Sequence, residues 1–378
     1  MQSEISKLIL LYIPTSICNN RCEYCFINHT DSWNEEKEKF KYSVDQMLLS
    51  LTRERLSGTC LINLTAKGET LLYKDLIPLV EGLLKEGHYV EIITNGSVKK
   101  VIDKFLAFPV SYQERLFFKI SYHYKEMLGK KKEEDFWENV KRIKESSCSF
   151  SLELMPYDSL NECVDNIINQ CIKHVGALCH ATVGRDDGNK QKTLLTNLSR
   201  KDYEKIWGKL DSPMFKLKMD LFGVKRKEFC YAGKWSIIID LASGKAGQCY
   251  GRPFSQNVFE DPSKPIQFFP VGYTCLQPFC FNGHSHVALG MLPDVNAPTY
   301  AQIRNRKCND GSEFLKPKCK DFFSQKIYNN NKQYTSMEKI FITCITPFYL
   351  LKTLFFDVKD NKRKLVKYIK IVTKGFIK

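Results

Sequence analysis

The first half of the sequence repeats one pattern, in which a short apolar run is followed by a polar loop and a segment with apolar residues at helical spacing. Apolar runs of strand length occupy residues 8–13, 60–65, 90–93, 116–121, 148–154 and 175–183. Helical spacing is found at residues 43–56, 74–86, 97–107, 133–145 and 160–173. Successive strand-loop-helix units indicate a parallel sheet built by right-handed crossovers. The pattern predicts an α/β fold with a partial (β/α)6 TIM barrel, whose functional loops follow the carboxyl ends of the strands.

The second half of the sequence has a different pattern. Residues 186–191 are polar and mark the exit from the barrel, and Ser199 resembles the N-cap of a short helix. Residues 237–240, the turn at 242–244 and the return to Cys249 predict a β-hairpin. We therefore expect four parts: a barrel at 1–185, a helical connector at 186–225, a smaller domain containing the hairpin at 226–325, and a C-terminal tail at 326–378.

The tail carries most of the excess charge. The net charge is +15, and residues 326–378 contain twelve Lys or Arg against three acidic residues. Residues 325–336 are rich in asparagine and predict a linker, and residues 340–356 are strongly apolar but interrupted by Pro347 and Lys352. That stretch is too short and too interrupted to predict a membrane span. A helix docked on the barrel or on a partner is favoured, with contact to an anionic membrane surface as the alternative.

Composition limits the class of protein. With 43% hydrophobic and 26% charged residues, the chain is typical of soluble globular proteins. The first residues lack the basic and small-residue features of a secretory signal, so we expect a cytoplasmic location. Fifteen cysteines in an intracellular chain indicate metal or redox chemistry rather than disulfides. The basic charge is accompanied by no nucleic-acid recognition motif, and no specific nucleic-acid partner is expected.

Three of the cysteines form one short loop directly after the first predicted strand. Cys18, Cys22 and Cys25 have the spacing Cys-x3-Cys-x2-Cys. Three thiolates can hold three irons of a cubane cluster, whereas a cluster ligated only by protein normally takes four cysteines. Zinc is the main alternative, although a structural zinc site needs a fourth ligand and His29 is the only nearby candidate.

This loop, together with the strand pattern around it, resembles the signature of the radical S-adenosylmethionine (SAM) superfamily. The resemblance implies a [4Fe-4S] cluster whose open iron is chelated by SAM, and reductive cleavage of SAM to a 5'-deoxyadenosyl radical that abstracts hydrogen from a substrate. The family has a Gly-Gly-Glu motif after the second strand, where this chain has Lys67-Gly68-Glu69. The resemblance implies that Gly68, Glu69, Ser121 after the fourth strand, and Tyr24 in the cysteine loop bind the cofactor. His123 and Glu153 are further polar residues near strand ends.

A second set of cysteines lies in the hairpin region. Cys230 and Cys249 lie at the two ends of the predicted hairpin, and Cys275 and Cys280 follow in a loop that contains Gly and Pro. Four cysteines can complete the coordination of a second cluster. The hairpin, with Gly244 five residues before Cys249, resembles the auxiliary-cluster domains called SPASM and twitch, and the single-cluster twitch arrangement fits better.

Several residues near this set leave alternatives open. His284 and His286 can complete a Cys2His2 zinc site with Cys275 and Cys280, or act as groups near a cluster or a substrate. Cys308 and Cys319 remain candidate extra ligands, which leaves one or two auxiliary clusters open. The run 304–307 is basic, and a solvated charged face is the favoured interpretation.

The sequence therefore predicts a radical SAM enzyme with an auxiliary [4Fe-4S] cluster. Peptide modification and oxidation of a small molecule or sugar are the two substrate classes that the resemblance implies. SAM, the substrate and an electron-donor protein such as flavodoxin or ferredoxin are the expected partners. The competing hypothesis is a non-catalytic scaffold in which both cysteine sets bind iron-sulfur or zinc and only stabilise a binding module.

Overall fold

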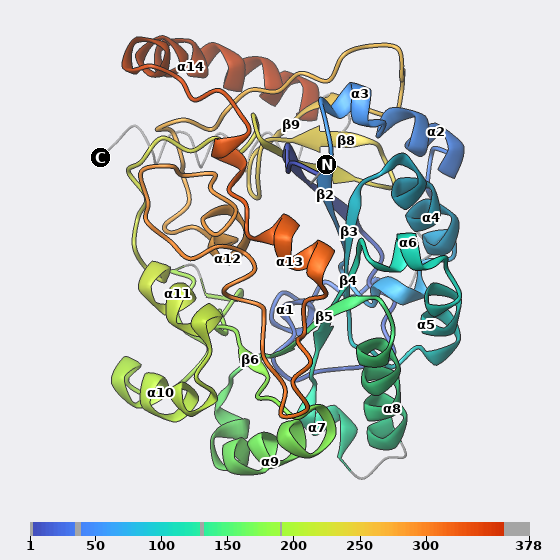
Figure 1. Cartoon of the computed structure of the whole chain (residues 1–378). Coiled ribbons are helices and arrows are strands. Elements are labelled where there is room, and N and C mark those ends of the chain that lie inside the picture. The colour runs from blue at the N-terminus through green and yellow to red at the C-terminus, as the bar shows by residue number, and fades with distance from the viewer. Residues whose placement is uncertain (1–2, 35–38, 129–131, 190, 359–378) are drawn as a thin grey trace.

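A computed structural model describes residues 3–34, 39–128, 132–189 and 191–358. Within these residues nine strands form one sheet in the order β6-β5-β4-β3-β2-β1-β7-β8-β9 (Figure 1). In chain order the strands are β1 Lys7–Ile13, β2 Cys60–Ala66, β3 Tyr89–Thr94, β4 Leu116–Ser121, β5 Ser149–Leu154, β6 His180–Ala181, β7 Ser236–Asp240, β8 Lys245–Gly247 and β9 Phe254–Asn257. Strands β1 to β6 pair in parallel, which confirms the predicted α/β class and the partial barrel.

Helices follow most of the parallel strands. In chain order they are α1 Phe26–His29, α2 Val44–Ser50, α3 Arg53–Leu56, α4 Leu76–Glu86, α5 Lys99–Leu106, α6 Val110–Gln113, α7 Tyr124–Met127, α8 Lys132–Glu145, α9 Val164–Val175, α10 Arg200–Trp207, α11 Pro213–Leu221, α12 Gly283–His286, α13 Pro317–Phe323 and α14 Ser336–Val358. Short 3-10 turns occupy Thr70–Leu72, Asp158–Cys163, Gly208–Leu210 and Ile327–Asn329.

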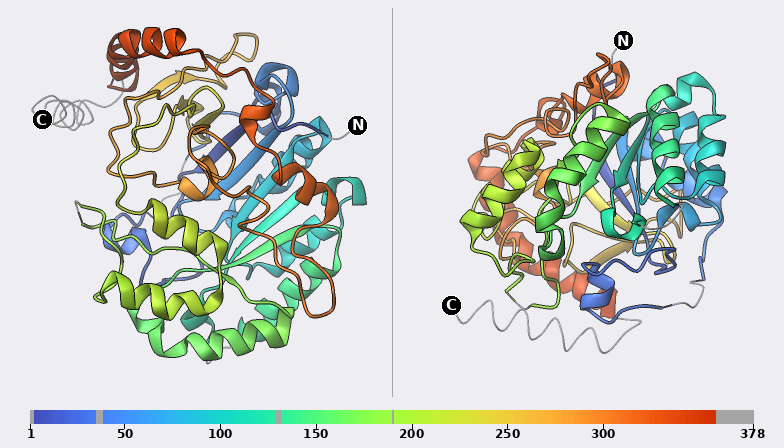
Figure 2. Two further views of the ribbon diagram at one scale, coloured as in Figure 1. Left: turned by 60° about the vertical axis from the view of Figure 1, so that its left-hand side comes forward. Right: turned by 90° about the horizontal axis from the view of Figure 1, so that it is seen from below.

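Both faces of the parallel sheet are buried. In β1, Ile9 and Leu11 belong to the apolar core that includes residues of α4, α5, α8 and α9, and Leu8 and Leu10 belong to a second core. The second core is built from α11, α13 and the chain between residues 287 and 303. Figures 1 and 2 show these later segments covering the face of the sheet opposite to α4, α5 and α8. Burial on two sides explains why the strands appear in the sequence as continuous apolar runs.

The hairpin joins the barrel sheet instead of forming a sheet of its own. Strand β7 pairs in parallel with β1, with Ile237 opposite Ile9, and β8 and β9 continue the sheet as antiparallel strands. The antiparallel strands at the C-terminal side agree with the predicted hairpin. The domain boundaries stay predictions. Strand β1 pairs with β2, which precedes the predicted boundary at residue 185, and with β7, which follows it.

Two predicted elements differ from the observed ones because local capping interrupts them. The helix expected at 43–56 is split, since the Thr52 hydroxyl accepts a hydrogen bond from the Arg55 backbone N–H (3.3 Å) and begins α3 as a new helix. The strand expected at 175–183 is reduced to β6. Gly176 ends α9 in the left-handed region (φ 78°), so the chain becomes extended only near His180.

Residues 336–358 of the C-terminal tail form α14, a helix of 23 residues that is longer than the sequence pattern suggested. Helix α14 packs beside β9, and it is the one helix in the described parts of the chain that is long and apolar enough to cross a membrane by length and composition. The expectation that this stretch is too short for a span is therefore corrected. The predicted linker before it contacts the residue that precedes β1, because the Asn331 side chain donates a hydrogen bond to the Ser6 carbonyl (2.9 Å). The lysine-rich segment at 359–378 lies outside the described residues.

The buried side chain of His88 gives the fold a specific sensitivity to acid. Its Nδ1 accepts from the Cys60 backbone N–H (3.1 Å) and its Nε2 donates to the Leu51 carbonyl (2.8 Å), so the ring is neutral. Burial lowers the pKa of His88 to about 4. Since the unfolded chain binds a proton near the ordinary pKa of about 6.5, stability falls as the pH drops from about 6.5 to 4.

We expect the His88→Gln variant to lose this contribution. Its free energy of unfolding should fall less steeply with decreasing pH than that of the wild type, by up to ~1.4 kcal/mol per pH unit. Urea unfolding followed by circular dichroism, at several pH values from about 7 to 4, measures both slopes. Because the substitution also changes stability at neutral pH, only the slopes are compared. Equal slopes would contradict a neutral buried histidine.

Candidate active site

The cysteine loop lies at the carboxyl end of β1, as predicted. Cys18, Cys22 and Cys25 all line one cavity of about 400 Å³, together with residues that follow β2, β3 and β4. The loop is shaped by its own hydrogen bonds. The Cys25 N–H donates to the Cys22 carbonyl (3.0 Å), and the Asn28 side chain donates to the same carbonyl (2.7 Å). The structure therefore brings the three thiols to one side of one cavity.

The loop is fixed to the end of β2 by backbone pairing. The N–H of Gly68 donates to the Thr15 carbonyl (2.8 Å), and the N–H of Glu69 donates to the Ile17 carbonyl (2.9 Å). A Cβ atom at residue 68 would lie 2.2 Å from the Ile17 carbonyl oxygen, which no side chain can tolerate. Glycine is therefore required at residue 68 by close approach. Lys67, which replaces the first glycine of the family motif, points its ammonium at the Ser32 carbonyl.

The Glu69 carboxylate lies in the cavity wall and holds the end of β3. One oxygen accepts from the Thr94 hydroxyl (2.6 Å) and the Leu71 N–H (2.9 Å), and the other accepts from the Asn95 N–H (2.8 Å). Burial raises the pKa of Glu69, although these donors oppose the shift. The Asn95 side chain continues the connection by donating to Asn19 in the cysteine loop (2.7 Å). Glu69 thus lies at the cavity, and its carboxylate already accepts hydrogen bonds that position the neighbouring loops.

Tyr24, Ser121 and His123 complete the wall opposite Glu69. The Tyr24 hydroxyl bonds to His123 Nδ1, which also lies 3.3 Å from Cys22 Sγ. Burial lowers the pKa of His123 to about 4, so the ring is neutral. All four residues predicted to bind the cofactor, Gly68, Glu69, Ser121 and Tyr24, therefore line the same cavity as the three thiols. Their roles stay predictions.

The residues of this cavity fit an iron-sulfur cluster and SAM. Burial raises the pKa of Cys22 to about 12 and also raises that of Cys18, so both thiols hold their protons until a metal displaces them. The side-chain nitrogen of Asn20 is buried in the cavity wall with no hydrogen-bond partner among the described residues. Such an unused donor suits a bound polar group. Sulfur ligands on one side and polar groups on the other match the two halves of this cofactor.

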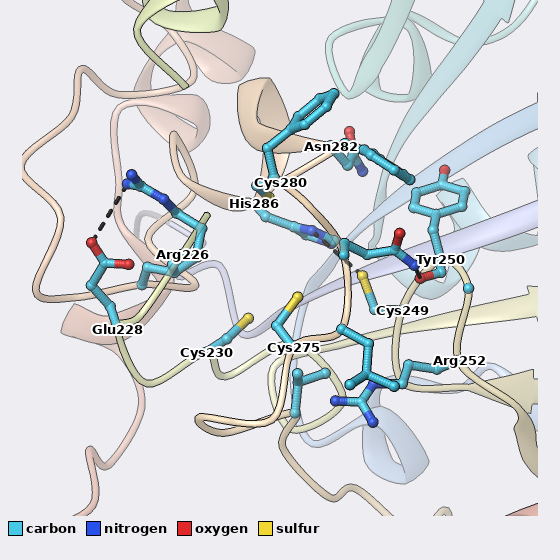
Figure 3. Close-up of a pocket in the computed structure, with 17 residues that line it drawn as sticks. Arg226, Glu228, Cys230, Cys249, Tyr250, Arg252, Cys275, Cys280, Asn282 and His286 are labelled. Carbon is cyan, nitrogen blue, oxygen red and sulfur yellow. Dashed lines mark hydrogen bonds and ion pairs between the residues drawn. The ribbon is translucent and has the colours of Figure 1, made fainter. Parts of the chain in front are cut away.

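The second cysteine set also converges. Cys230, Cys249, Cys275 and Cys280 line one pocket, and Figure 3 shows the sulfurs of the first three directed into the same space. Cys230 pairs with Gly272 through two backbone hydrogen bonds (3.2 and 2.9 Å), and Arg252 ties the Cys249 loop to Thr274 (2.9 Å). Three separate segments therefore present together the four thiols, Cys230, Cys249, Cys275 and Cys280, that the sequence interpretation assigned to one site.

The electrostatics of this pocket suit a group of thiolates. Burial raises the pKa of Cys249 to about 12 and raises those of Cys230 and Cys280. Arg226 and Arg252 line the pocket, and one terminal nitrogen of Arg252 is buried with no hydrogen-bond partner in the described chain. In residues 3–34, 39–128, 132–189 and 191–358, no three His, Cys, Asp or Glu side chains are grouped closely enough to hold a single metal ion.

The two histidines of α12 lie in different environments. His286 faces the cysteine pocket, with its Nδ1 4.0 Å from Cys249 Sγ. His284 points elsewhere, with its Nε2 3.4 Å from the Lys119 ammonium. The two candidate extra ligands do not line the pocket. Cys319 donates to the Glu114 carbonyl (3.4 Å), and Cys308 lies against Gly176.

A further cavity connects the two cysteine sites. It has a volume of about 600 Å³ and reaches Cys249, Tyr250 and Arg252. Six residues line both this cavity and the one that holds the first three cysteines: Phe26, Thr65, Ala66, Arg185, Asp187 and Phe281. A molecule in the shared region would therefore have the three-cysteine loop on one side and Cys249 on the other.

Beneath the cavities lies a buried charged network that the sequence interpretation missed. Glu153 is paired with Arg304 and lies 3.6 Å from the Lys119 ammonium. Burial alone would raise the pKa of Glu153, but the charges of Arg304 and Lys119 lower it. Arg304 is fully buried, so its assignment to a solvated charged face was wrong. Lys119 could have been recognised in the sequence as a buried charge, because it is a lysine within the apolar run 116–121.

Lys218 of α11 is the other missed residue of this region. Its ammonium donates to the Thr182 hydroxyl and it lines the cavity of the three cysteines. Burial, and then the charge of Lys119, lowers the pKa of Lys218 to about 7. In the sequence this residue has no distinguishing signal, because it lies among other lysines in the predicted helical connector.

The chain combines a parallel partial barrel, a three-cysteine loop after the first strand, and a cofactor-sized cavity at the carboxyl ends of the strands. Residues 12–170 match the family model of the radical SAM superfamily. The matched segment runs from the end of β1 into α9 and includes the three-cysteine loop, so this part of the chain is similar to the radical SAM superfamily. No curated protein matches the sequence.

Several solved structures are similar to part of the chain. SuiB of Streptococcus suis bound to S-adenosylmethionine has 14% identity and a TM-score of 0.48, covering 68% of this chain and 64% of SuiB. Native anSMEcpe with bound AdoMet has 15% identity and a TM-score of 0.40, covering 68% and 79%. BtrN in complex with AdoMet and 2-DOIA has 15% identity and a TM-score of 0.37, covering 69% and 81%. The similarity thus spans less than two thirds of the length of SuiB.

The close approach at residue 68 can be tested with two glycine substitutions. Gly68→Ala would force the Ile17 carbonyl and the adjoining cysteine loop to move, so we expect most of the iron at this loop to be lost after anaerobic reconstitution. Gly208→Ala is the matched control, since a Cβ there meets nothing within 4 Å. Iron and sulfide per chain are measured in a background where Cys230, Cys249, Cys275 and Cys280 are replaced by alanine. If Gly68→Ala bound as much iron per chain as the protein with Gly68, the proposed requirement for glycine at residue 68 would be contradicted.

Proposed function

We propose that the chain is a radical SAM enzyme that abstracts hydrogen from a substrate held between its two cysteine sites. Cys18, Cys22 and Cys25 would hold the catalytic [4Fe-4S] cluster, and Gly68, Glu69, Ser121 and Tyr24 would contact SAM. When bound, the cluster and SAM supply the 5'-deoxyadenosyl radical, and the protein supplies binding, orientation and exclusion of water. The observation that carries this proposal is the wall of six residues that the cavity of the three cysteines shares with the further cavity that reaches Cys249.

The second site would hold one auxiliary [4Fe-4S] cluster through Cys230, Cys249, Cys275 and Cys280, in a twitch-like arrangement. Four convergent thiols and two guanidinium groups support this assignment, because the arginines offset the negative charge of a thiolate-ligated cluster. His286 would then be a neighbour of the cluster near Cys249, and His284 a group below the substrate cavity. In this arrangement the second cluster can accept the electron that remains after hydrogen abstraction.

The charge of the connected cavities favours an anionic substrate. Their walls include Lys67, Arg185, Lys192, Lys218 and Arg252, against the carboxylates of Glu69 and Asp187. Asp187 is already paired with Arg185 (2.8 Å). Within the described residues, Lys218 donates a hydrogen bond to the neutral hydroxyl of Thr182, and no carboxylate forms an ion pair with it. We therefore propose that a carboxylate or phosphate of the substrate binds at Lys218.

The substrate itself belongs to one of two classes, a peptide or a small molecule such as a sugar. SuiB has been solved with a precursor peptide and BtrN with 2-DOIA, so both classes are represented among the similar structures. With the cluster and SAM in the cavity of about 400 Å³, the further cavity of about 600 Å³ would have room for a small molecule or for one side chain of a peptide. A cytoplasmic flavodoxin or ferredoxin would supply the electron that starts the reaction.

The catalytic proposal predicts which cysteines control SAM cleavage. Anaerobically reconstituted and reduced wild-type protein should convert SAM to 5'-deoxyadenosine. In the Cys18→Ala/Cys22→Ala/Cys25→Ala variant this activity should fall by at least about 100-fold, and the iron content should fall by the amount that one cluster contains. Cys60→Ala is the control, because Cys60 is buried in β2 away from both pockets. Wild-type protein that forms no 5'-deoxyadenosine, with iron unchanged in the triple variant, would favour the non-catalytic scaffold.

The anion proposal predicts a role for Lys218 in substrate affinity. Candidate substrates are tested as pairs with and without a carboxylate or phosphate, and only the anionic member should stimulate 5'-deoxyadenosine formation. Lys218→Met should raise the KM of that member about 10- to 100-fold, since a charged hydrogen bond contributes about 1.5–3 kcal/mol. Lys218→Arg should restore part of the affinity.

Lys216→Met is the matched control for Lys218, because Lys216 is on the same helix and exposed. Substrate-independent cleavage of SAM should be similar in all these variants, so that loss of anion binding is distinguished from loss of the radical chemistry. Equal stimulation by the neutral member of each pair would contradict the assignment.

A further inference from the structure

Helix α14 has two faces, and the face that packs on the protein is comparatively polar. Its buried residues are Ile342, Thr346, Thr353 and Asp357. The hydroxyls of Thr346 and Thr353 bond to carbonyls of their own helix (2.7 and 2.8 Å). Tyr349 lies between them along the same face and stacks on Phe269, with ring centroids 4.2 Å apart. These contacts fix the helix against β9 and the loop that follows it.

The opposite face of α14 is apolar and exposed. Its large side chains are 54% to 75% exposed and form a continuous stripe of Met337, Ile340, Phe341, Phe348, Leu351 and Phe355. The exposed Cys344 lies between Phe341 and Phe348 on this stripe. Spacings of three and four residues keep all of these side chains on one side of the helix. In Figures 1 and 2 the helix lies at the margin of the molecule, beyond β9.

The polarity of α14 is therefore opposite to that of an ordinary surface helix, which buries its apolar side. Three exposed phenylalanines in one stripe give a contiguous apolar surface of the kind that marks an interaction site. The packing of the inner face also argues against a helix that leaves the protein to span a bilayer. A partner that covers only the outer face is required.

The charge next to the stripe identifies that partner. Residues 359–378, which follow the helix directly, contain eight Lys or Arg and one Asp. Lys352 is exposed between Phe348 and Phe355. A second copy of the chain would cover the apolar stripe, but it carries the same net charge of +15 and offers no excess of negative charge to these cations. An anionic lipid surface satisfies both features, since it takes up apolar side chains and attracts cations by about 1 kcal/mol per Lys or Arg.

We propose that the outer face of α14 binds an anionic membrane surface, lying in the plane of the interface with the phenylalanines in the acyl boundary and the lysines at the headgroups. The protein would then be a peripheral membrane protein whose active site stays in water. This inference is independent of the proposed function, because α14 lines neither of the cavities that meet the cysteine loop.

The test is vesicle binding by the full-length, cluster-loaded protein. Vesicles of phosphatidylcholine alone are compared with vesicles that also contain about one third phosphatidylserine, and bound protein is measured by co-sedimentation. We expect at least about 10-fold tighter binding to the anionic vesicles, and weaker binding as salt is raised from about 0.1 M to 1 M. Phe348→Ser/Phe355→Ser should reduce binding by about 10-fold or more, because both rings leave the interface.

The control variant is Leu49→Ser/Val110→Ser, which removes two apolar side chains of similar exposure (63% and 59%) from α2 and α6. It should bind vesicles like the wild type. Circular dichroism and substrate-independent SAM cleavage confirm that both double variants are folded. Equal binding to neutral and anionic vesicles, or no effect of the phenylalanine substitutions, would overturn the proposal. Light scattering that shows a dimer abolished by Phe348→Ser/Phe355→Ser would also overturn it.

Discussion

The backbone pairing between β1 and β2 extends beyond both strands, and the arrangement of the candidate active site depends on that extension. Residues 15 to 17 accept hydrogen bonds from Gly68 and Glu69, so the segment that enters the cysteine loop is held as firmly as a strand. From there Glu69 reaches Thr94 and Asn95, and Asn95 reaches back to Asn19. Three βα loops are thereby joined to one another by hydrogen bonds between protein groups. The absence of a side chain at Gly68 permits this approach.

A second constraint lies below the cavity, where charged side chains replace the apolar core. Along β4 the inward residues change from Phe117 to Lys119 to Ser121 toward the carboxyl end of the strand. Glu153 neutralises part of the cationic charge of Lys119 and Arg304. Removal of one member of such a buried pair typically costs about 3–5 kcal/mol, so the network resists rearrangement. The floor of the cavity is therefore both polar and rigid, which suits a site that must orient a reactive molecule.

Much of the fold could be predicted because the apolar runs directly encode strands buried on two faces. The three-cysteine loop and Gly68-Glu69 could be placed because each follows such a run. Arg304 could not, because a charge far along the chain shows no sign in sequence of its partner Glu153. Lys218 was missed for the same reason. The convergence of Cys275 and Cys280 on Cys249 depends on loop pairings such as Arg252 with Thr274, which have no periodic signal. The domain boundaries and the roles of the site residues stay predictions.

The pairing of β7 with β1 has a consequence for the distance between the two cysteine sites. Cys18 follows β1 and Cys230 precedes β7, and because these adjacent strands are parallel, the two residues lie beyond opposite ends of one strand pair. Hinge motion between two separate domains would make the gap between redox centres fluctuate, and with it the rate of electron tunnelling. In this chain the gap is set by a continuous sheet. Any electron that passes between the sites therefore crosses a distance that depends on the length of these two strands.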